Sequence, residues 1–316
     1  MKLKEAKIVF MGTPFFAKEI LENLLKSKIK IDLVVTQPDK LAGRRKIKKS
    51  SEVKILAKKY GLPLVQFEKL DSAAFEKIKS LAPDLVIVAA YGMIIPKSFL
   101  EIPHYGFINI HTSLLPKLRG ASPIHTALIQ DLKETGVTIM KIDERLDSGN
   151  IIDQKKVSID EADKYSDLEK KLIDSANEIL INSLNNYLKN QESIPQDHQE
   201  ATFTKIIKKE DGKIDWNQDA ENIWNNFRAF YNWPGSFTFW NKRGILKKLT
   251  LMEIELSQNP GENKRNGQVY QIGKKVFVKA GKHSILIKKI QLEGKNEMPI
   301  ENFLNGNPDL VGAILK

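Results

Sequence analysis

The first part of the chain alternates short apolar runs with longer amphipathic stretches. Residues 7–11, 31–36 and 84–89 are mostly apolar and predict buried strands, and the segments 15–26 and 73–80 repeat apolar residues at helical spacing. Strands that alternate with helices form βαβ units, which build a parallel sheet covered on both faces. The pattern therefore predicts an α/β fold whose N-terminal domain is a doubly wound, Rossmann-like sheet.

The pattern changes after a long amphipathic helix that we expect at residues 166–189. Residues 190–207 have the polar, proline-containing composition of a linker, with order expected to resume near residue 201. A helix at 220–230 is then followed by short strand-like runs, separated by Gly and Asn turns, at residues 236–240, 249–254, 267–270, 276–279 and 284–287. Such runs predict a small antiparallel β-barrel. We expect an N-terminal domain at 1–189, a linker at 190–207 and a barrel domain at 208–316.

One predicted strand carries two polar residues on the same face. From Phe107 to His111 apolar residues alternate with Asn109 and His111, and side chains two residues apart in a strand point to one side. Asn is uncommon in strands, so Asn beside His indicates a polar site at the end of the strand. Proline then forces a turn at 113–116, and a helix is predicted to start at Pro123.

A second strand is predicted at 136–140, and the loop after it carries Asp147. In an open parallel sheet the loops that follow strands line the ligand crevice, so we expect Asp147 to meet Asn109 and His111 there. A neutral His accepts a proton near pH 7, a carboxylate orients it, and an amide N–H stabilises an oxyanion. The three residues suit acyl transfer to an amine by direct attack, because the chain has no Cys and Ser113 is not in a nucleophile elbow. The alternative is a structural His on a loop whose polar groups are satisfied.

Composition narrows the class of protein. The absence of Cys excludes disulfides and thiolate metal sites and fits a reducing compartment. No segment reaches the ~20 apolar residues of a membrane span and the N-terminus lacks a secretory signal, so we expect a cytoplasmic protein. A net charge of +11 and a pI of about 9.4 indicate a polyanionic partner, unless they reflect only a lysine-rich solvated surface.

The densest charge lies at residues 40–59, where nine Lys and Arg residues accompany only one acid, Glu52. Such a block is commonly a solvated loop, but beside an active-site crevice it also suits a clamp on phosphates, which we favour. Further lysines are scattered along the predicted barrel: Lys247, Lys248, Lys274, Lys275, Lys279, Lys282, Lys288 and Lys289. The single Gly12 after the first strand excludes the G-x-G-x-x-G dinucleotide fingerprint, and no Walker loop is present.

Short motifs are distributed over the whole chain: Gly12-Thr13-Pro14, Thr36-Gln37-Pro38-Asp39, Ala89-Ala90-Tyr91-Gly92, Asn109-Ile110-His111, Ser113-Leu114-Leu115-Pro116, Arg119-Gly120 and Leu146-Asp147-Ser148-Gly149. In combination they resemble the bacterial methionyl-tRNA formyltransferases. The resemblance implies transfer of the formyl group of 10-formyltetrahydrofolate to the α-amine of methionyl initiator tRNA, which gives N-formylmethionyl-tRNA for translation initiation. It implies no metal, no membrane and no obligate protein partner, and we expect a monomer.

The resemblance also implies roles for individual residues. Asn109 and His111 would stabilise the tetrahedral oxyanion, His111 would help to move protons, and Asp147 would orient His111. Folate binding is implied for Ser113, Leu114, Leu115, Pro116, Tyr91 and Gly92. Contacts with the tRNA acceptor stem are implied for a basic loop with Arg44, Arg45, Lys46, Lys48 and Lys49, and the C-terminal domain would be an oligonucleotide-binding-like barrel that touches tRNA.

The sequence departs from the family pattern at Leu41, often Pro, at Arg45, often Gly, and at Asn150, often Asp. Three other functions share part of the pattern. A sugar or nucleotide N-formyltransferase and a formyltetrahydrofolate hydrolase would share Asn109, His111 and Asp147 but need neither the basic loop nor the basic barrel. A non-enzymatic RNA-binding protein would explain the charge and leave the three polar residues unexplained.

Overall fold

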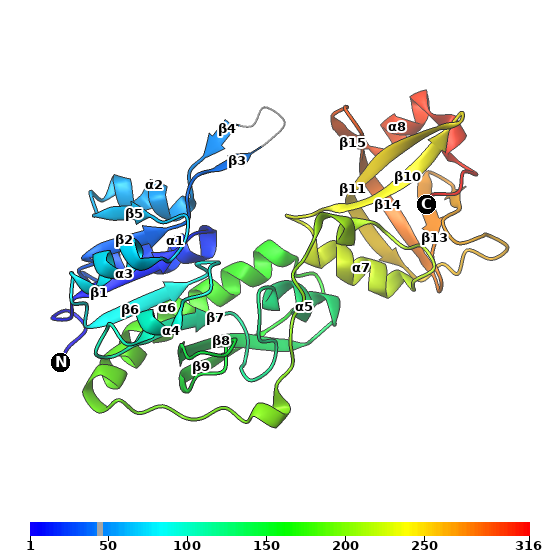
Figure 1. Cartoon of the computed structure of the whole chain (residues 1–316). Helices are drawn as coiled ribbons and strands as arrows, with labels where there is room; N and C mark the ends of the chain where they lie inside the picture. The colour runs from blue at the N-terminus through cyan, green and yellow to red at the C-terminus, as the bar shows by residue number, and fades with distance from the viewer. Residues whose placement is uncertain (43–46) are drawn as a thin grey trace. The chain divides into compact units, whose positions relative to one another are not determined.

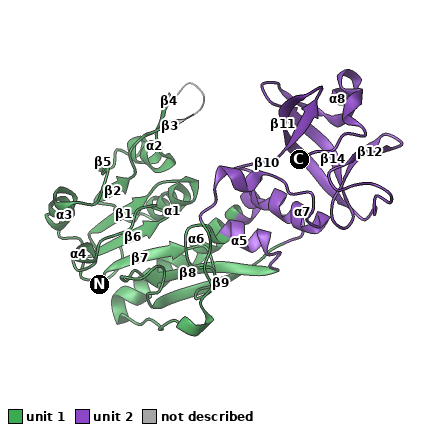
Figure 2. Cartoon of the chain, turned by 45° about the vertical axis from the view of Figure 1, so that its right-hand side comes forward, with its two compact units in different colours: residues 1–123, 133–159, 169–205 green, residues 124–132, 160–168, 206–316 purple. Residues whose placement is uncertain are grey.

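The computed structural model describes residues 1–42 and 47–316, which form two compact units (Figures 1 and 2). Unit 1 comprises residues 1–123, 133–159 and 169–205, and unit 2 comprises residues 124–132, 160–168 and 206–316. Within the described ranges, no helix combines the length and the apolar character needed to cross a membrane.

Unit 1 is built around one seven-stranded sheet with the order β5-β2-β1-β6-β7-β8-β9. Its elements are β1 (Ile8–Gly12), α1 (Phe15–Lys26), β2 (Leu33–Thr36), β3 (Lys40–Ala42), β4 (Ile47–Lys49), α2 (Glu52–Lys59), β5 (Leu64–Gln66), α3 (Ser72–Lys79), β6 (Leu85–Ala89), α4 (Lys97–Leu100), β7 (Phe107–His111), β8 (Glu134–Lys141), β9 (Ile151–Ser158), most of α6 (Tyr165–Asn190) and a 3₁₀ turn at His198–Glu200. The helices α3 and α4 pack on the face that carries Val9 and Val86. On the other face α1 lies beside α6, and the Asn23 side chain donates a 3.3 Å hydrogen bond to the carbonyl of Asn177. The predicted doubly wound α/β fold is confirmed.

The direction of β8 differs from the prediction. The strands from β5 to β7 are parallel, but β8 runs antiparallel to β7, with Lys141 opposite Ile108 and Thr138 opposite His111. The edge strand β9 is in turn antiparallel to β8. The expectation that this part of the sheet is parallel is therefore wrong. Alternating side chains identify a strand but carry no information on its direction.

Residues 40–59 are not one basic loop. The strands β3 and β4 form an antiparallel hairpin with Lys40 opposite Lys49. The helix α2 follows, and the hydroxyl of Ser51 caps it by accepting a 3.1 Å hydrogen bond from the backbone N–H of Lys54. The high charge of this stretch concealed a capped helix whose apolar residues recur at helical spacing.

Residues 191–205, expected to lie in a linker, are bound to unit 1, and we call them the strap. Ile194 exchanges backbone hydrogen bonds of 2.7 and 2.8 Å with Ile151 at the start of β9. The backbones of Thr202 and Thr204 each make a 2.8 Å hydrogen bond with the backbone of Arg119. The polar composition of the strap therefore reflects hydrogen bonds to the protein as well as contact with water.

Unit 2 contains a six-stranded antiparallel sheet with the order β10-β11-β14-β13-β12 and β15 paired with β14. Its elements are α5 (Pro123–Ile129), which enters unit 2 at Ile124, a 3₁₀ turn at Lys209–Gly212, α7 (Ala220–Ala229), β10 (Ser236–Lys242), β11 (Ile245–Ser257), β12 (Val269–Ile272), β13 (Lys275–Lys279), β14 (Ser284–Leu292), β15 (Glu297–Pro299), α8 (Ile300–Gly306) and a 3₁₀ turn at Pro308–Leu310. The C-terminal residues bridge the two edge strands. Gly312 and Ala313 make backbone hydrogen bonds with Val269 of β12, and Lys316 exchanges two of 2.9 Å with Phe239 of β10. The predicted small barrel is confirmed, whereas β15 and α8 were not predicted.

Arg228 explains why residues 124–132 and 160–168, which precede the strap in the chain, pack with unit 2. Its side chain is buried and donates hydrogen bonds to Asp131 (3.0 Å), to the side-chain oxygen of Asn225 (2.7 Å) and to the carbonyl of Asp163 (3.2 Å). Burial lowers the pKa of Arg228, and Asp131 opposes this effect. A buried cation holds its partners firmly, because losing one leaves the charge uncompensated. Residues 124–132 and 160–168, which lie within the predicted N-terminal domain at 1–189, therefore pack with unit 2.

Candidate active site

Asn109 and His111 project from the same face of β7, as the period of a strand requires. The backbone of Asn109 lies between Val88 of β6 and Met140 of β8, so the site sits on a central strand. His111 is buried, with 6% of its surface exposed, and Asn109 is half-buried. Among the described residues, the side-chain amide of Asn109 has no hydrogen-bond partner, so its N–H groups are available to a ligand.

A hydrogen bond fixes the tautomer of His111. Its Nε2 lies 3.0 Å from the carbonyl oxygen of Leu118. A carbonyl oxygen only accepts, so Nε2 carries the proton. In the neutral ring Nδ1 is then unprotonated, and it lies 3.7 Å from Oδ2 of Asp147. A proton gained at Nδ1 therefore produces an imidazolium beside a carboxylate.

Asp147 reaches His111 by a different route from the one predicted. Because β8 is antiparallel, it ends beside Ile108, and the following loop must return along the face of β7 to bring Asp147 to His111. Asp147 has a φ of +47°, and its Oδ2 accepts a 2.8 Å hydrogen bond from the backbone N–H of Gly120. Gly149 permits the close return, since a Cβ at this position would lie 2.0 Å from the backbone oxygen of Lys141. The predicted meeting of Asp147 with His111 is thus present, although the parallel-sheet argument for it is wrong.

The strap supplies a residue that the sequence analysis missed, Gln196. Its Oε1 accepts hydrogen bonds from Nη2 (2.6 Å) and Nε (3.2 Å) of the buried Arg119. Its Nε2 donates to the backbone oxygens of Asp147 (3.0 Å) and Gly149 (2.7 Å). Nη2 of Arg119 also lies 3.0 Å from Nδ1 of His198. The linker-like composition hid this residue, and the only signal was the expected return of order near residue 201.

The turn after β7 presents two side chains of the predicted folate motif. The hydroxyl of Thr138 donates to the carbonyl of Ser113 (2.6 Å) and accepts from the N–H of Leu115 (3.1 Å). Ser113 and Leu115 are buried, the Ser113 hydroxyl donates to a carbonyl of the same turn (2.6 Å), and the bond before Pro116 is cis. Leu114 and Pro116 are half-buried and keep surface for a ligand.

The ring of Tyr91 points into the core beside Phe99. Within the described residues its buried hydroxyl has no hydrogen-bond partner, and burial raises the pKa of Tyr91 to about 12. The carbonyl of Tyr91 accepts hydrogen bonds from the side chains of Thr13 (3.0 Å) and Gln37 (2.9 Å). Gly92 follows with a φ of +81°, and a Cβ there would lie 2.7 Å from Nε2 of Gln37. The Tyr91 side chain therefore belongs to the core, and its carbonyl is engaged by Thr13 and Gln37.

Residues 6–184 match the formyl transferase family, and residues 206–308 match the formyl transferase C-terminal domain. The chain is 42% identical over 312 residues to the methionyl-tRNA formyltransferase of Caldicellulosiruptor saccharolyticus, covering 98% of this chain and 99% of that protein. It is 39% identical over 304 residues to the methionyl-tRNA formyltransferase of Halalkalibacterium halodurans, covering 95% and 94%. The chain belongs to the methionyl-tRNA formyltransferase family.

More distant structures share the fold of this family. HypX from Aquifex aeolicus, solved in complex with tetrahydrofolic acid, superposes with a TM-score of 0.65 at 16% identity, covering 95% of this chain and 47% of HypX. WlaRD, a sugar 3N-formyl transferase, superposes with a TM-score of 0.64 at 20% identity, covering 92% and 99%.

The family resemblance predicts tRNA contacts for five basic residues, Arg44, Arg45, Lys46, Lys48 and Lys49. Three of the predicted residues, Arg44, Arg45 and Lys46, lie outside the described residues. The other two, Lys48 and Lys49, are exposed, and Lys49 lies 3.8 Å from Glu52 across side chains that remain solvated. Such an exposed pair contributes little and leaves Lys49 available to phosphate.

The nearby Lys54 is not available in the same way. Its Nζ lies 2.8 and 2.7 Å from the two carboxylate oxygens of Asp39 and 2.7 Å from the side-chain oxygen of Gln66. The hydrogen bond from Lys54 lowers the pKa of Asp39. The charge of this lysine therefore serves the fold of unit 1, and the basic block offers less free charge than its sequence indicates.

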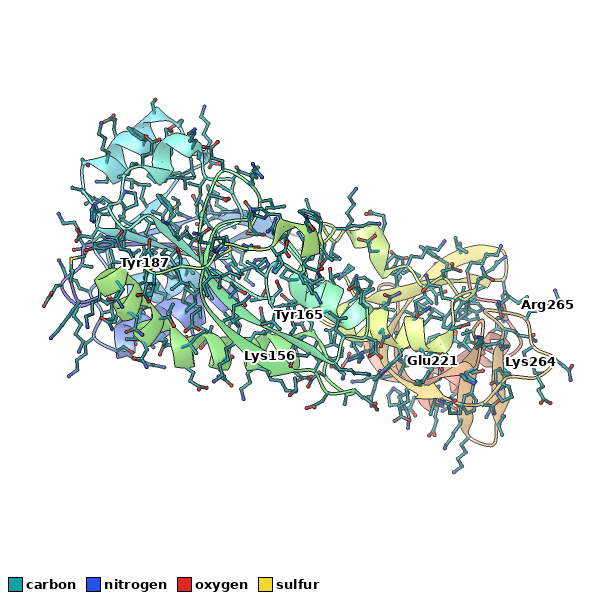
Figure 3. All side chains as sticks on the ribbon, turned by 90° about the horizontal axis from the view of Figure 1, so that it is seen from below. Lys156, Tyr165, Tyr187, Glu221, Lys264 and Arg265 are labelled. Carbon is teal, nitrogen blue, oxygen red and sulfur yellow. The ribbon has the colours of Figure 1, made fainter. Side chains whose placement is uncertain are left out.

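Many of the barrel lysines are also engaged within unit 2. Ion pairs link Lys282 to Asp219 (3.7 Å), Lys288 to Glu255 (3.2 Å) and Lys289 to Glu297 (2.7 Å). Lys279 donates to two backbone carbonyls, and Lys248 lies over the ring of Phe237. The predicted lysines without such partners in the described part are Lys247, Lys274 and Lys275. Figure 3 shows two further basic residues, Lys264 and Arg265, on the loop between β11 and β12 at one end of unit 2.

Proposed function

We propose that this chain transfers the formyl group of 10-formyltetrahydrofolate to the α-amine of methionyl initiator tRNA. The observation that carries the proposal is the His111–Asp147 pair beside the Asn109 amide, which has no partner among the described residues, in a chain that matches methionyl-tRNA formyltransferases over nearly its whole length. The product is N-formylmethionyl-tRNA, and the absence of Cys is consistent with a reaction in the cytoplasm.

The geometry supports a proposed role for each of the three residues. The amine attacks the formyl carbon, and the carbonyl oxygen becomes an oxyanion that the amide N–H of Asn109 stabilises. Nδ1 of His111 is the unprotonated nitrogen, so it takes the proton that the amine loses. The imidazolium that results is stabilised by Asp147 and donates to the oxyanion. Return of the proton to the folate nitrogen accompanies cleavage of the bond between that nitrogen and the formyl carbon, which restores the neutral His111.

We assign the folate donor to the two turns beside β7. Leu114 and Pro116 supply apolar surface. The segment at Tyr91 and Gly92 lies at the edge of a flat ring, where it offers backbone other than the Tyr91 carbonyl, which Thr13 and Gln37 already occupy. Ser113 shapes the turn instead of touching the ligand, because its hydroxyl is buried and already donates to a carbonyl. Leu115 is likewise an internal residue of the turn.

We assign the tRNA to the basic hairpin and to the free lysines of the barrel. The exposed Lys48 and Lys49 continue the run of Arg44, Arg45 and Lys46, and the whole chain carries a net charge of +11. Phosphate contacts of this kind provide affinity and position the nucleic acid without reading its sequence. A sugar N-formyltransferase or a hydrolase has no use for this charge.

Transfer of labelled formyl from 10-formyltetrahydrofolate tests the proposal. Parallel reactions contain methionyl initiator tRNA, methionyl elongator tRNA or no acceptor. We expect label on the initiator tRNA alone. Free formate in every reaction would identify a hydrolase, and no consumption of the folate would favour a non-enzymatic RNA-binding protein.

A further inference from the structure

We propose that Gln196 is a positioning residue for the formyl transfer, which acts by holding the Asp147 loop against His111. This inference rests on the proposed function for its kinetic consequences, but the contacts themselves do not. Gln196 belongs to the strap, and its amide lies between the guanidinium of Arg119 and the backbone oxygens of Asp147 and Gly149.

Every hydrogen-bonding position of the Gln196 amide is used. Its oxygen accepts twice from Arg119, and its nitrogen donates once to Asp147 and once to Gly149. A guanidinium only donates and a backbone carbonyl only accepts, so the two ends of the amide cannot be exchanged. Gln196 is 6% exposed, so water does not readily replace these bonds. The site thus requires an amide of this length, with donors on the side of the Asp147 loop.

The strap also holds the turn that positions His111, the partner of Asp147. The hydroxyl of Thr202 accepts a 2.8 Å hydrogen bond from the N–H of Leu118. The carbonyl of Leu118 in turn accepts the hydrogen bond from Nε2 of His111. Gly120, which binds the carboxylate of Asp147, packs so closely on the strap that a Cβ would lie 2.7 Å from the Thr204 hydroxyl. One segment therefore positions both the base and its carboxylate, and Gln196 is its contact with the backbone of the Asp147 loop.

The variant Gln196→Glu tests this role most sharply. Glu has the same shape and still accepts from Arg119, but it loses both donors and places negative charge against two carbonyl oxygens. We expect kcat to fall by about 10- to 100-fold, as small displacements of a catalytic group do, with KM for tRNA changed by less than about twofold. The control is Gln199→Glu, the same chemical change at an exposed position of the strap. An unchanged kcat in Gln196→Glu would overturn the proposal.

A double-mutant cycle separates positioning from general damage. If Gln196 acts through Asp147, Gln196→Glu has no further effect on kcat once Asp147→Ala has been introduced. Loss of the same factor in both backgrounds would show that Gln196 acts elsewhere and would overturn the proposal. Circular dichroism establishes that each variant is folded, and Gln196→Met, which lacks the donors without adding charge, replaces Gln196→Glu in the cycle if the latter does not fold.

Hydrogen exchange at the Gly120 amide provides a readout that needs no substrate. This N–H is bonded to the Asp147 carboxylate, so we expect it to exchange faster in Gln196→Glu than in the wild type or in Gln199→Glu. Unchanged exchange would overturn the positioning role even if formyl transfer is confirmed. Faster exchange in a protein whose wild type does not formylate methionyl initiator tRNA would support the positioning role and refute the proposed function.

Discussion

Replacing Asp147 by Asn removes the charge that faces His111 while leaving the loop in place. Oδ2 of Asp147 lies 3.7 Å from Nδ1 of His111 and accepts a 2.8 Å hydrogen bond from the N–H of Gly120. The amide oxygen of Asn can still accept from Gly120. Its NH₂ group would then face Nδ1 of His111, where it favours the unprotonated ring and opposes the proton transfer that the reaction requires.

The structure sets bounds on the size of this effect. Two unit charges about 4 Å apart interact with roughly 4 kcal/mol at an effective dielectric constant of ~20. Since ~1.4 kcal/mol is a factor of ten in rate, the upper limit for Asp147→Asn is on the order of 10³-fold in kcat. The Asp147 side chain is 16% exposed, so water screens part of the charge. Loss of a preorganised electrostatic group lowers kcat by at least about 10²-fold, which we take as the lower limit.

Single-turnover formylation of methionyl initiator tRNA measures this loss directly. The control is Glu144→Gln, which removes a carboxylate from the same loop. The partner of Glu144 is the exposed Lys97. We expect tRNA binding to be retained in Asp147→Asn, because the carboxylate faces His111. Turnover within a few-fold of the wild type would refute the role of Asp147. Loss of tRNA binding would show that the Asp147 carboxylate acts in tRNA binding and not on His111.

Three further outcomes follow from the described contacts. Asn109→Ala should lower kcat by about 10²-fold with tRNA binding retained, since it removes an oxyanion donor; near-normal kinetics would contradict this role. Lys48→Ala and Lys49→Ala should each reduce the slope of log K against log salt for tRNA binding by about 1, and an unchanged slope would remove that residue from the interface. Tyr91→Phe should raise the free energy of unfolding in urea by up to about 1 kcal/mol, because the buried hydroxyl has no partner among the described residues. A lower value would mean that the hydroxyl has a partner.

The parts of the fold that the sequence predicted depend on short-range pattern. Apolar runs located the strands β1, β2 and β6, and the period of two placed Asn109 and His111 on one face without any knowledge of their neighbours. The direction of β8 was beyond this reasoning, because a strand has the same alternation whichever way it runs. The meeting of Asp147 with His111 was therefore expected for an incorrect reason.

The strap shows why part of the site could not be predicted from the sequence. Gln196 lies 49 residues from Asp147 and 77 from Arg119 along the chain, and its own neighbours have the composition of a flexible linker. Hydrogen-bonding capacity alone does not reveal a partner, since a polar side chain in a loop is equally satisfied by water. The partners of Lys54 could not be predicted from the sequence either. Its charge was counted toward a phosphate clamp, but Asp39 and Gln66 already bind it.

Hydrogen bonds between segments that are distant in the sequence determine which substitutions the site tolerates. The site is supported by β7, the turn at 118–122, the loop around Asp147 and the strap. Hydrogen bonds join the turn, the loop and the strap in a closed series, and His111 of β7 is attached to this series through Leu118. The first two segments follow one another in the chain, but the other two arrive from elsewhere, so the distance between His111 and Asp147 depends on the backbone of the strap. Substitutions in the strap should therefore alter kcat when they remove bonds to Arg119 or to the Asp147 loop. An exposed strap residue whose side chain makes no such bond, such as Gln199, should leave kcat intact when it is replaced.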